Sequence, residues 1–189
     1  MASENRAQGN YGGEGSARER RGPAPYRDPV LLLTMAGAFA LDQFSKYLVA
    51  TNMYLGQSWP REGLFRITYG LNTGTIFGLF PGQTLILTAA SIVAISFLVY
   101  FYRTHATPSP LLRLAVGLQL GGALGNLLDR LRIGAVVDFL DVGWWPIFNL
   151  ADSSIMVGIT ILAWYILFGP EEGGGGEGDD GGAVTDADR

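Results

Sequence analysis

The apolar residues of this chain fall into four long blocks that are separated by polar segments. The blocks cover residues 30–50, 84–102, 111–128 and 147–168. A helix needs about 20 mostly apolar residues to cross the roughly 30 Å of hydrocarbon in a bilayer, and each block is about that long. In a soluble domain the apolar residues would instead recur with a period of about 2 or 3.6. The pattern therefore predicts an all-α membrane protein with four transmembrane helices.

The two ends of the chain are polar and differ in charge. Residues 1–28 carry five arginines, and residues 169–189 are rich in Gly, Glu and Asp. Such segments bury too little apolar surface to fold. We therefore expect a disordered basic arm and a disordered acidic tail on either side of a membrane domain at 29–168. Because the first apolar block begins late and has no small-x-small site at its end, a cleavable signal peptide is not expected.

The positions of Lys and Arg predict the orientation, because these residues gather near the cytoplasmic ends of membrane spans. The arginines of the arm precede the first block, and Arg103 and Arg113 flank the link between the second and third blocks. If these residues are cytoplasmic, both termini are cytoplasmic and the two longer loops lie outside. The outer side then receives a smaller set of cations: Lys46, Arg61, Arg66, Arg130 and Arg132.

The loop at 51–82 is too long for a simple connection between helices. Apolar and polar residues alternate in part over 64–69, which predicts a short strand. Tyr54 and Trp59 are residue types that favour a membrane interface. We therefore expect a small β-containing region on the outer side.

Ionisable residues within an apolar block need an explanation, because each costs several kcal/mol in hydrocarbon unless it is paired or faces a wet cavity. Asp42 lies about two-thirds of the way along the first block, and Lys46 follows four residues later on the same helix face. One interpretation is an ion pair at the membrane edge, with Lys46 reaching out to water. The other is a supporting role in a functional site, which the short side chain of Asp42 favours.

The third block ends in a run of small and polar residues. Gly117, Gly121 and Gly125 repeat every four positions, which is typical of closely packed membrane helices. A second group of side chains shares one face at the outer end of this block: Asn126, Asp129 and Arg130. These three either anchor the end of the helix or contact a substrate, and the spacing alone leaves both interpretations open.

Two carboxylates in the last third of the chain have no basic partner nearby in sequence. Asp138 lies between two apolar residues, whereas Asp141 could simply be solvated. Asp152 is expected about one and a half turns into the fourth helix, roughly 8 Å deep, on the same face as Asn149. Capping of the helix N-terminus is the alternative role for Asp152.

Asp138 and Asp152 both fall at the outer end of the predicted bundle. Two carboxylates that share a desolvated site do not both ionise easily, so one tends to stay protonated beside a charged partner. One group can then activate water while the other protonates the carbonyl oxygen or the leaving nitrogen. Such a pair can cleave an amide without a metal or a covalent intermediate.

The chain has no cysteine and a single histidine, His105. Disulfides, reactive thiols and thiolate metal sites are therefore excluded, and the ligands of a zinc peptidase are missing. We expect no cofactor, no bound metal and no nucleic-acid partner.

Four segments resemble, in order and in spacing, the motifs of bacterial lipoprotein signal peptidases (signal peptidase II). They lie at 42–46, 72–78, 121–139 and 148–153, and the resemblance covers about 30–168. The second segment departs from the family pattern, because Thr75 and Ile76 stand where small alanines are usual.

This resemblance implies an aspartic endopeptidase of the bacterial inner membrane whose catalytic pair is Asp138 and Asp152. It implies that a second set of residues binds the substrate or shapes the site: Asn72, Gly74, Asn126, Arg130 and Asn149. It also implies a supporting set: Asp42, Lys46 and Asp129. The implied substrates are prolipoproteins within membrane lipid whose cysteine carries diacylglycerol, with cleavage just before that cysteine near the outer face.

Two rival functions have some support in the sequence. A serine peptidase could use Ser45, Ser153 or Ser154, but the topology puts His105 on the cytoplasmic side, away from all three. A non-catalytic, proton-coupled transporter could use the membrane carboxylates as a relay. Four short spans without an inverted repeat are a weak basis for alternating access.

Overall fold

The computed structural model describes residues 25–74, 84–104 and 109–168. Four long helices carry most of this chain: α1 (Pro29–Asn52), α2 (Thr84–Thr104), α3 (Pro110–Ile133) and α4 (Leu150–Phe168). A short 3-10 helix, η1 (Pro25–Arg27), precedes α1. Three strands complete the fold: β1 (Ser58–Trp59), β2 (Arg66–Asn72) and β3 (Val136–Asp141). The expected disordered arm and tail, as well as Thr75, Ile76 and His105, lie wholly or almost wholly outside the described residues.

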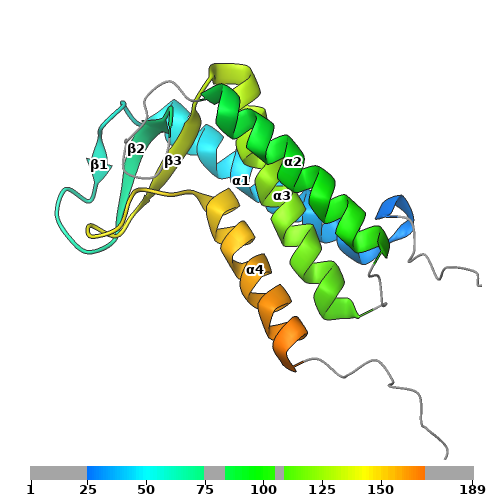
Figure 1. The fold of residues 1–189 in the computed structure, drawn as a ribbon. Helices are drawn as coiled ribbons and strands as arrows, with labels where there is room; N and C mark the ends of the chain where they lie inside the picture. The colour runs from blue at the N-terminus through cyan, green and yellow to red at the C-terminus, as the bar shows by residue number, and fades with distance from the viewer. Residues whose placement is uncertain (1–24, 75–83, 105–108, 169–189) are drawn as a thin grey trace, which may run out of the picture.

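Helix α3 is the centre of the bundle and packs against α1, α2 and α4 (Figure 1). Its glycines permit this close packing. A Cβ atom on Gly117 would lie 2.8 Å from the Cβ of Thr34 on α1, and one on Gly121 would lie 2.8 Å from the Cβ of Ala38. Gly158 of α4 approaches Gln119 of α3 in the same way. The regular glycine spacing therefore does mark a packed helix face.

Three of the described helices, α2, α3 and α4, are long and apolar enough to cross a membrane. Helix α1 is not among them, because its second half carries Asp42, Gln43 and Lys46. The prediction of a mainly helical membrane protein with a small sheet is confirmed, whereas the count of four spans stays a prediction.

Two helix boundaries differ from those predicted. Helix α3 continues past residue 128 to Ile133 and ends at Gly134, whose φ of 70° suits a residue without a side chain. Helix α4 begins at Leu150 rather than at residue 147. Phe148, two residues before the helix, is held in extended conformation because its N–H donates to the carbonyl oxygen of Leu140 at 3.1 Å.

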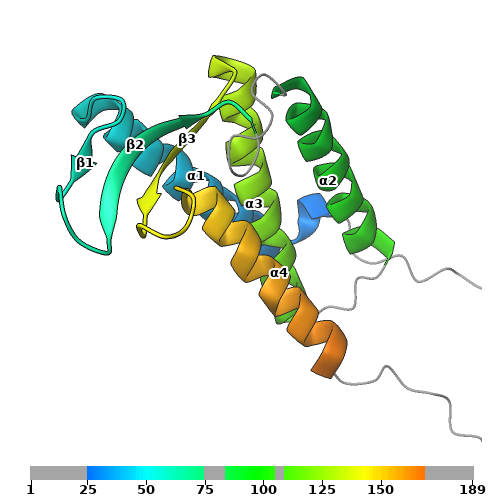
Figure 2. The same cartoon turned by 60° about the vertical axis from the view of Figure 1, so that its left-hand side comes forward.

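The sheet lies at one end of the helices and has the antiparallel order β1-β2-β3 (Figure 2). Strand β2 overlaps the predicted strand at 64–69 but runs on to Asn72. Strand β3 was not predicted, since most of its residues are buried and it lacks the alternation of a half-exposed strand. Gly70 of β2 pairs with Asp138 of β3, so the sheet places Asp138 beside the helix ends.

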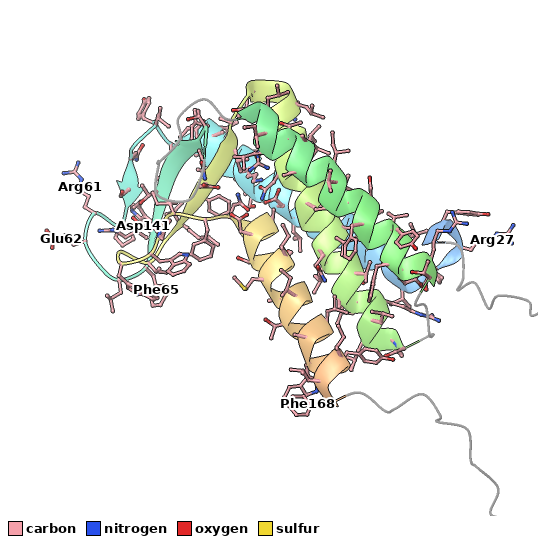
Figure 3. All side chains as sticks on the ribbon, viewed as in Figure 1. Arg27, Arg61, Glu62, Phe65, Asp141 and Phe168 are labelled. Carbon is pink, nitrogen blue, oxygen red and sulfur yellow. The ribbon has the colours of Figure 1, made fainter. Side chains whose placement is uncertain are left out.

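The opposite end of the bundle holds the apolar core and both ends of the described chain. Arg27 and Phe168 lie far from the sheet, whereas Arg61, Glu62 and Phe65 lie at its outer tip (Figure 3). The core at this end is formed by Leu31, Leu98, Tyr102, Leu112, Val116 and Leu120. Because η1 and the end of α4 both lie away from the sheet, the molecule has two distinct ends.

Candidate active site

Buried polar side chains gather where the sheet meets the helices. They come from α1, α3, β3 and the residue before α4: Asp42, Lys46, Asn126, Asp129, Asp138 and Asn149. Burying polar and charged groups is costly unless each finds partners. The hydrogen bonds and ion pairs of this cluster provide those partners.

Lys46 is the cation of the cluster and is only 3% exposed. Its Nζ lies 2.8 Å from Asp42 Oδ2, 2.9 Å from Asp129 Oδ2 and 2.9 Å from Asn126 Oδ1. An ammonium group has three donors, so all of them are satisfied inside the protein. The expected ion pair between Asp42 and Lys46 is therefore present, but the idea that Lys46 reaches out to water at the membrane edge is wrong.

Asp42 connects α1 to the start of α4. Its Oδ1 accepts a hydrogen bond from the backbone N–H of Ala151, at 2.9 Å, in the first turn of α4. A carboxylate is favoured at this position because the N–H groups of the first turn have no partner within the helix. Gly125 of α3 makes room for the carboxylate, since a Cβ atom there would overlap Asp42 Oδ2.

Gln43 belongs to the same cluster, and the sequence analysis missed it. Its Nε2 lies 3.2 Å from Asp42 Oδ2, 3.1 Å from Asp129 Oδ1 and 3.3 Å from the carbonyl oxygen of Gly125. The signal was available, because an amide side chain within an apolar block also needs partners.

Asn149 and Asp152 cap the start of α4 for each other. Asn149 Oδ1 accepts a hydrogen bond from the backbone N–H of Asp152 at 2.9 Å, and Asp152 Oδ2 accepts one from the backbone N–H of Asn149 at 3.3 Å. This reciprocal pattern is a capping box. The predicted depth of one and a half turns is therefore wrong, because the helix begins later and Asp152 lies in its first turn.

The same Asn149 side chain also reaches the other acid. Its Nδ2 donates to Asp138 Oδ1 at 2.7 Å and lies 3.2 Å from Asn126 Oδ1. Asn126 Nδ2 in turn donates to Asp152 Oδ1 at 2.8 Å. Asn149 thus contacts both acids: its side chain donates to the Asp138 carboxyl group, and its backbone N–H donates to the Asp152 carboxylate. The two acids therefore meet in one network.

Asp138 is held from the other side by β2. Asn72 Nδ2 donates to Asp138 Oδ2 at 3.0 Å, and Asn72 Oδ1 accepts a hydrogen bond from the backbone N–H of Gly74 at 3.2 Å. Burial raises the pKa of Asp138, the hydrogen bonds from Asn72 and Asn149 lower it, and the charge of Asp152 raises it, so that the pKa is about 6. Asp138 therefore holds a proton at a higher pH than an ordinary carboxyl group does.

Asp129 and Arg130 follow on α3 and differ in their contacts. Asp129 Oδ2 accepts a hydrogen bond from the backbone N–H of Val137 at 3.3 Å, which ties α3 to β3 beside Asp138. Arg130 Nη1 lies 3.3 Å from the carbonyl oxygen of Asn126 and 3.4 Å from Ser91 Oγ of α2. Arg130 is partly exposed and has a buried Nε without a hydrogen-bond partner among the described residues.

Asp141 lies outside this network, on the side of the sheet that carries the outer tip (Figure 3). The idea that Asp141 is merely solvated is wrong, because it is 7% exposed. Its Oδ2 lies 2.9 Å from Arg66 Nη2 and accepts a hydrogen bond from Thr68 Oγ1 at 2.8 Å. The hydrogen bond from Arg66 lowers the pKa of Asp141, so the two buried acids of β3 differ in electrostatic setting.

The serines of the rival peptidase hypothesis have ordinary helical partners. Ser153 Oγ donates to the carbonyl oxygen of Asn149 at 3.0 Å, and Ser45 Oγ donates to that of Asp42 at 2.8 Å. No histidine occurs within the described ranges, since His105 lies outside them. These contacts give no support to an activated serine.

The site therefore combines a carboxyl group of raised pKa with a second, partly exposed carboxylate, both positioned by amides. Such a pair at one end of a helical membrane bundle suits hydrolysis of an amide bond by general acid–base chemistry.

Comparison with known proteins agrees with this class of protein. Residues 34–168 match the family model of signal peptidase (SPase) II. The lipoprotein signal peptidase of Moorella thermoacetica is 45% identical over 147 residues, which are 77% of this chain and 97% of the relative. That of Halothermothrix orenii is 45% identical over 128 residues, which are 67% of this chain and 87% of the relative.

Two solved structures of a bacterial membrane enzyme have the same fold. One, at 2.3 Å resolution, has a TM-score of 0.68 and 33% identity and covers 72% of this chain and 87% of its own. The other, at 1.9 Å resolution, has a TM-score of 0.68 and 32% identity and covers 74% and 94%. The chain belongs to the signal peptidase II family, so the resemblance of its four motifs is confirmed. It is accordingly a membrane peptidase, and the transporter hypothesis is not supported.

Proposed function

We propose that this peptidase is an aspartic endopeptidase whose catalytic pair is Asp138 and Asp152. The observation that carries the proposal is the Asn149 side chain, which hydrogen-bonds to Asp138 at 2.7 Å and to the backbone N–H of Asp152 at 2.9 Å. One buried residue thus contacts both acids, because the backbone N–H of Asn149 also donates to the Asp152 carboxylate. Asn72 with Gly74, Asn126 and Asn149 orient the pair, while Asp42, Lys46 and Asp129 support the elements that carry it.

The raised pKa of Asp138, about 6, makes this residue the acid of the pair. Asp152 accepts N–H donors at both oxygens and is partly exposed, so it is the base that meets water. Asp152 takes a proton from water as the water oxygen attacks the scissile carbonyl carbon, and Asp138 gives its proton to the carbonyl oxygen. When the C–N bond breaks, the leaving nitrogen takes a proton from Asp152, and one hydroxyl of the tetrahedral intermediate returns its proton to Asp138 as the new carboxyl group forms. Arg130 lies near enough to Asp138 and Asp152 to interact with both electrostatically. In this proposal it contacts the substrate backbone.

The proposed substrates are prolipoproteins whose cysteine carries diacylglycerol, cleaved just before that cysteine. The relatives are named lipoprotein signal peptidases. The site lies at the sheet end of the helices, which supports a position near a membrane interface. A lipid-modified signal peptide is itself apolar and would present its scissile bond at that depth.

The test uses purified protein and a diacylglyceryl-modified prolipoprotein. We expect Asp138→Asn and Asp152→Asn to fold normally but to lose at least about 100-fold in kcat, since general acid–base groups contribute that much or more. The matched control is Asp141→Asn, which removes another buried acid of β3 that lies outside the network. A fully active Asp138→Asn protein, or equal loss in the Asp141→Asn control, would rule out the proposed pair.

A second test addresses the lipid. Wild-type protein should cleave the same prolipoprotein poorly when the cysteine carries no diacylglycerol. Equal rates for the two substrates would show that the lipid is not recognised.

We also propose that α1 is the fourth membrane span and that the protein lies in the bacterial inner membrane with both termini cytoplasmic. The buried partners of Asp42 and Lys46 support the first point, because these charges do not face lipid. Arg27 and Phe168 both lie away from the sheet, which supports the proposal that the two termini share one side of the membrane (Figure 3).

Because the chain has no cysteine, single-cysteine variants can report on this orientation directly. A membrane-impermeant maleimide added to intact spheroplasts should label Arg61→Cys, at the tip of the sheet, and should label Arg27→Cys only after the membrane is opened. Labelling of Arg27→Cys in intact spheroplasts would reverse the proposed orientation.

A further inference from the structure

A groove opens directly beside Asp152. It has a volume of about 440 Å³ and lies between the segment that follows β3 and the first turns of α4. Its main lining residues are Trp144, Trp145, Phe148, Asp152, Met156 and Val157. Asp152 is the only ionisable residue in the lining, so the groove joins the proposed catalytic pair to an apolar surface.

The apolar wall of this groove is available for contact. Met156 is 62% exposed, and Val157 and Trp145 are each 50% exposed. Met156 and Val157 lie on α4, a helix apolar enough to cross a membrane, so we expect an apolar occupant in the groove. The occupant must also carry a polar group at one end, where the groove meets Asp152.

The shape of the groove favours one apolar part of the proposed substrate. The groove is open, and a helix with its side chains is about 10 Å wide, so the apolar helix of a signal peptide would touch it along one side only. An extended acyl chain is much thinner and can lie within the groove of about 440 Å³.

A second groove of similar size provides a comparison. It measures about 430 Å³ and is lined by α1 and α3, mainly by Phe39, Leu124, Leu128 and Leu131. None of its lining residues is polar, and it does not reach either acid. An ordinary membrane lipid could enter either groove, whereas only the groove on α4 leads to the proposed site of cleavage.

We propose that the groove on α4 binds an acyl chain of the diacylglyceryl group on the substrate cysteine. This inference rests on the proposed function and adds the location of its lipid subsite. The modified cysteine is adjacent to the scissile bond, so its acyl chains begin close to the catalytic pair. Met156 and Val157 are then specificity-determining residues that contact the chain and not the reacting atoms.

The first experiment fills the groove. Val157→Trp should raise KM for a substrate with palmitoyl chains about tenfold, the loss expected when roughly two methylenes lose their contacts, with kcat little changed. The same variant should cleave a substrate with butanoyl chains like wild type. The matched control, Leu131→Trp, fills the groove on α1 and α3 from a similarly exposed position and should affect neither substrate.

Equal effects of Val157→Trp on the two substrates, or no effect on either, would overturn the inference while leaving the proposed function intact. Wild-type protein that cleaves neither substrate would instead overturn the proposed function, and the inference with it.

A second experiment does not depend on how Val157→Trp folds. A palmitoyl chain bearing a diazirine, on substrate bound to the Asp152→Asn protein, should label Trp145, Met156 or Val157. Labelling confined to the groove on α1 and α3, or equal in both grooves as for bulk lipid, would overturn the proposal. Labelling of the α4 groove from a diazirine in the signal peptide's apolar segment would overturn it as well, because that segment would then be the occupant.

Discussion

Amide side chains organise the acids of this site. Asn149 and Asn72 donate to the two oxygens of Asp138 at 2.7 and 3.0 Å, and Asn126 donates to Asp152 at 2.8 Å. An amide can donate to an acid without adding a charge, so it orients the group while leaving its proton available. These neutral residues therefore contribute to the electrostatic balance of the pair.

Replacing Asn72 should change the pH dependence of the enzyme. The Asn72 hydrogen bond stabilises ionised Asp138 and lowers its pKa. In Asn72→Ala the pKa of Asp138 should rise above about 6, by up to roughly one unit, the effect of one hydrogen bond to a charged group. Asp138 then keeps its proton to higher pH, and the alkaline limb of kcat/KM should move upward.

The control for this prediction is Asn52→Ala, which removes an exposed asparagine at the end of α1. Its pH profile should match that of wild type. A downward shift of the alkaline limb in Asn72→Ala would show that Asp138 is not the acid.

Removing the charge of Lys46 should destabilise the fold. Lys46→Met leaves Asp42 and Asp129 buried without their cation, and breaking a buried ion pair in this way costs about 3–5 kcal/mol. The apparent Tm in detergent should fall clearly. The double variant Lys46→Met/Asp129→Asn should recover part of the loss, because it removes one of the two orphaned charges. A single variant as stable as wild type would mean that the ion pairs do not stabilise the fold.

The sequence was sufficient to single out Asp138 and Asp152, because neither has a basic neighbour along the chain. It was not sufficient for Asp141, whose partner Arg66 lies 75 residues away on another strand. The depth of Asp152 was also wrong, since Asn149 acts as a helix cap through its side chain and the apolar residues before it are extended.

At the level of elements, the glycines of α3 set how closely the helices approach. Gly121→Ala should weaken folding, because the new Cβ would lie 2.5 Å from the carbonyl oxygen of Met35, a backbone atom that cannot move aside alone. We expect a loss of about 1–3 kcal/mol, measured as a lower unfolding temperature.

Gly37→Ala on α1 is the matched control for this prediction, since a Cβ there would meet no atom within 4 Å. It should be neutral or slightly stabilising, because alanine favours a helix more than glycine does. Equal losses in the two variants would point to helix propensity and not to packing.

The long helices were predictable because their apolar blocks have nearly the length of the elements. Strand β3 was not predictable, since a short strand that is buried on both faces has no periodic pattern to separate it from a loop. Its pairing with β2 depends on residues 66–72, which lie more than 60 positions earlier in the chain. The register between β2 and β3 therefore could not be derived from the local sequence of either strand.

At the level of the whole molecule, a second polar cluster fastens the end away from the sheet. Asp28 caps α1 through the backbone N–H groups of Val30 and Leu31, accepts a hydrogen bond from the hydroxyl of Tyr102 on α2, and lies 3.1 Å from Arg113 Nε on α3. One aspartate thus joins three helices at the end opposite the proposed catalytic pair.

Tyr102→Phe should lower stability without changing catalysis. It removes one donor from a buried carboxylate, which costs about 1–3 kcal/mol. The unfolding temperature should fall, while kcat of the folded protein should stay within about twofold of wild type. A large loss of kcat at full stability would instead reveal coupling between the two ends.

The hydrogen bond between Asp42 and the backbone of Ala151 has a consequence for the order of assembly during synthesis. Its two partners are 109 positions apart, on α1 and α4. This hydrogen bond can therefore form only after the first turn of α4 has left the ribosome. Asn149, which contacts both acids, is likewise synthesised after α1, α3 and β3 and directly before α4. On the proposed assignment, the catalytic pair is therefore complete only after α4 has been synthesised and inserted.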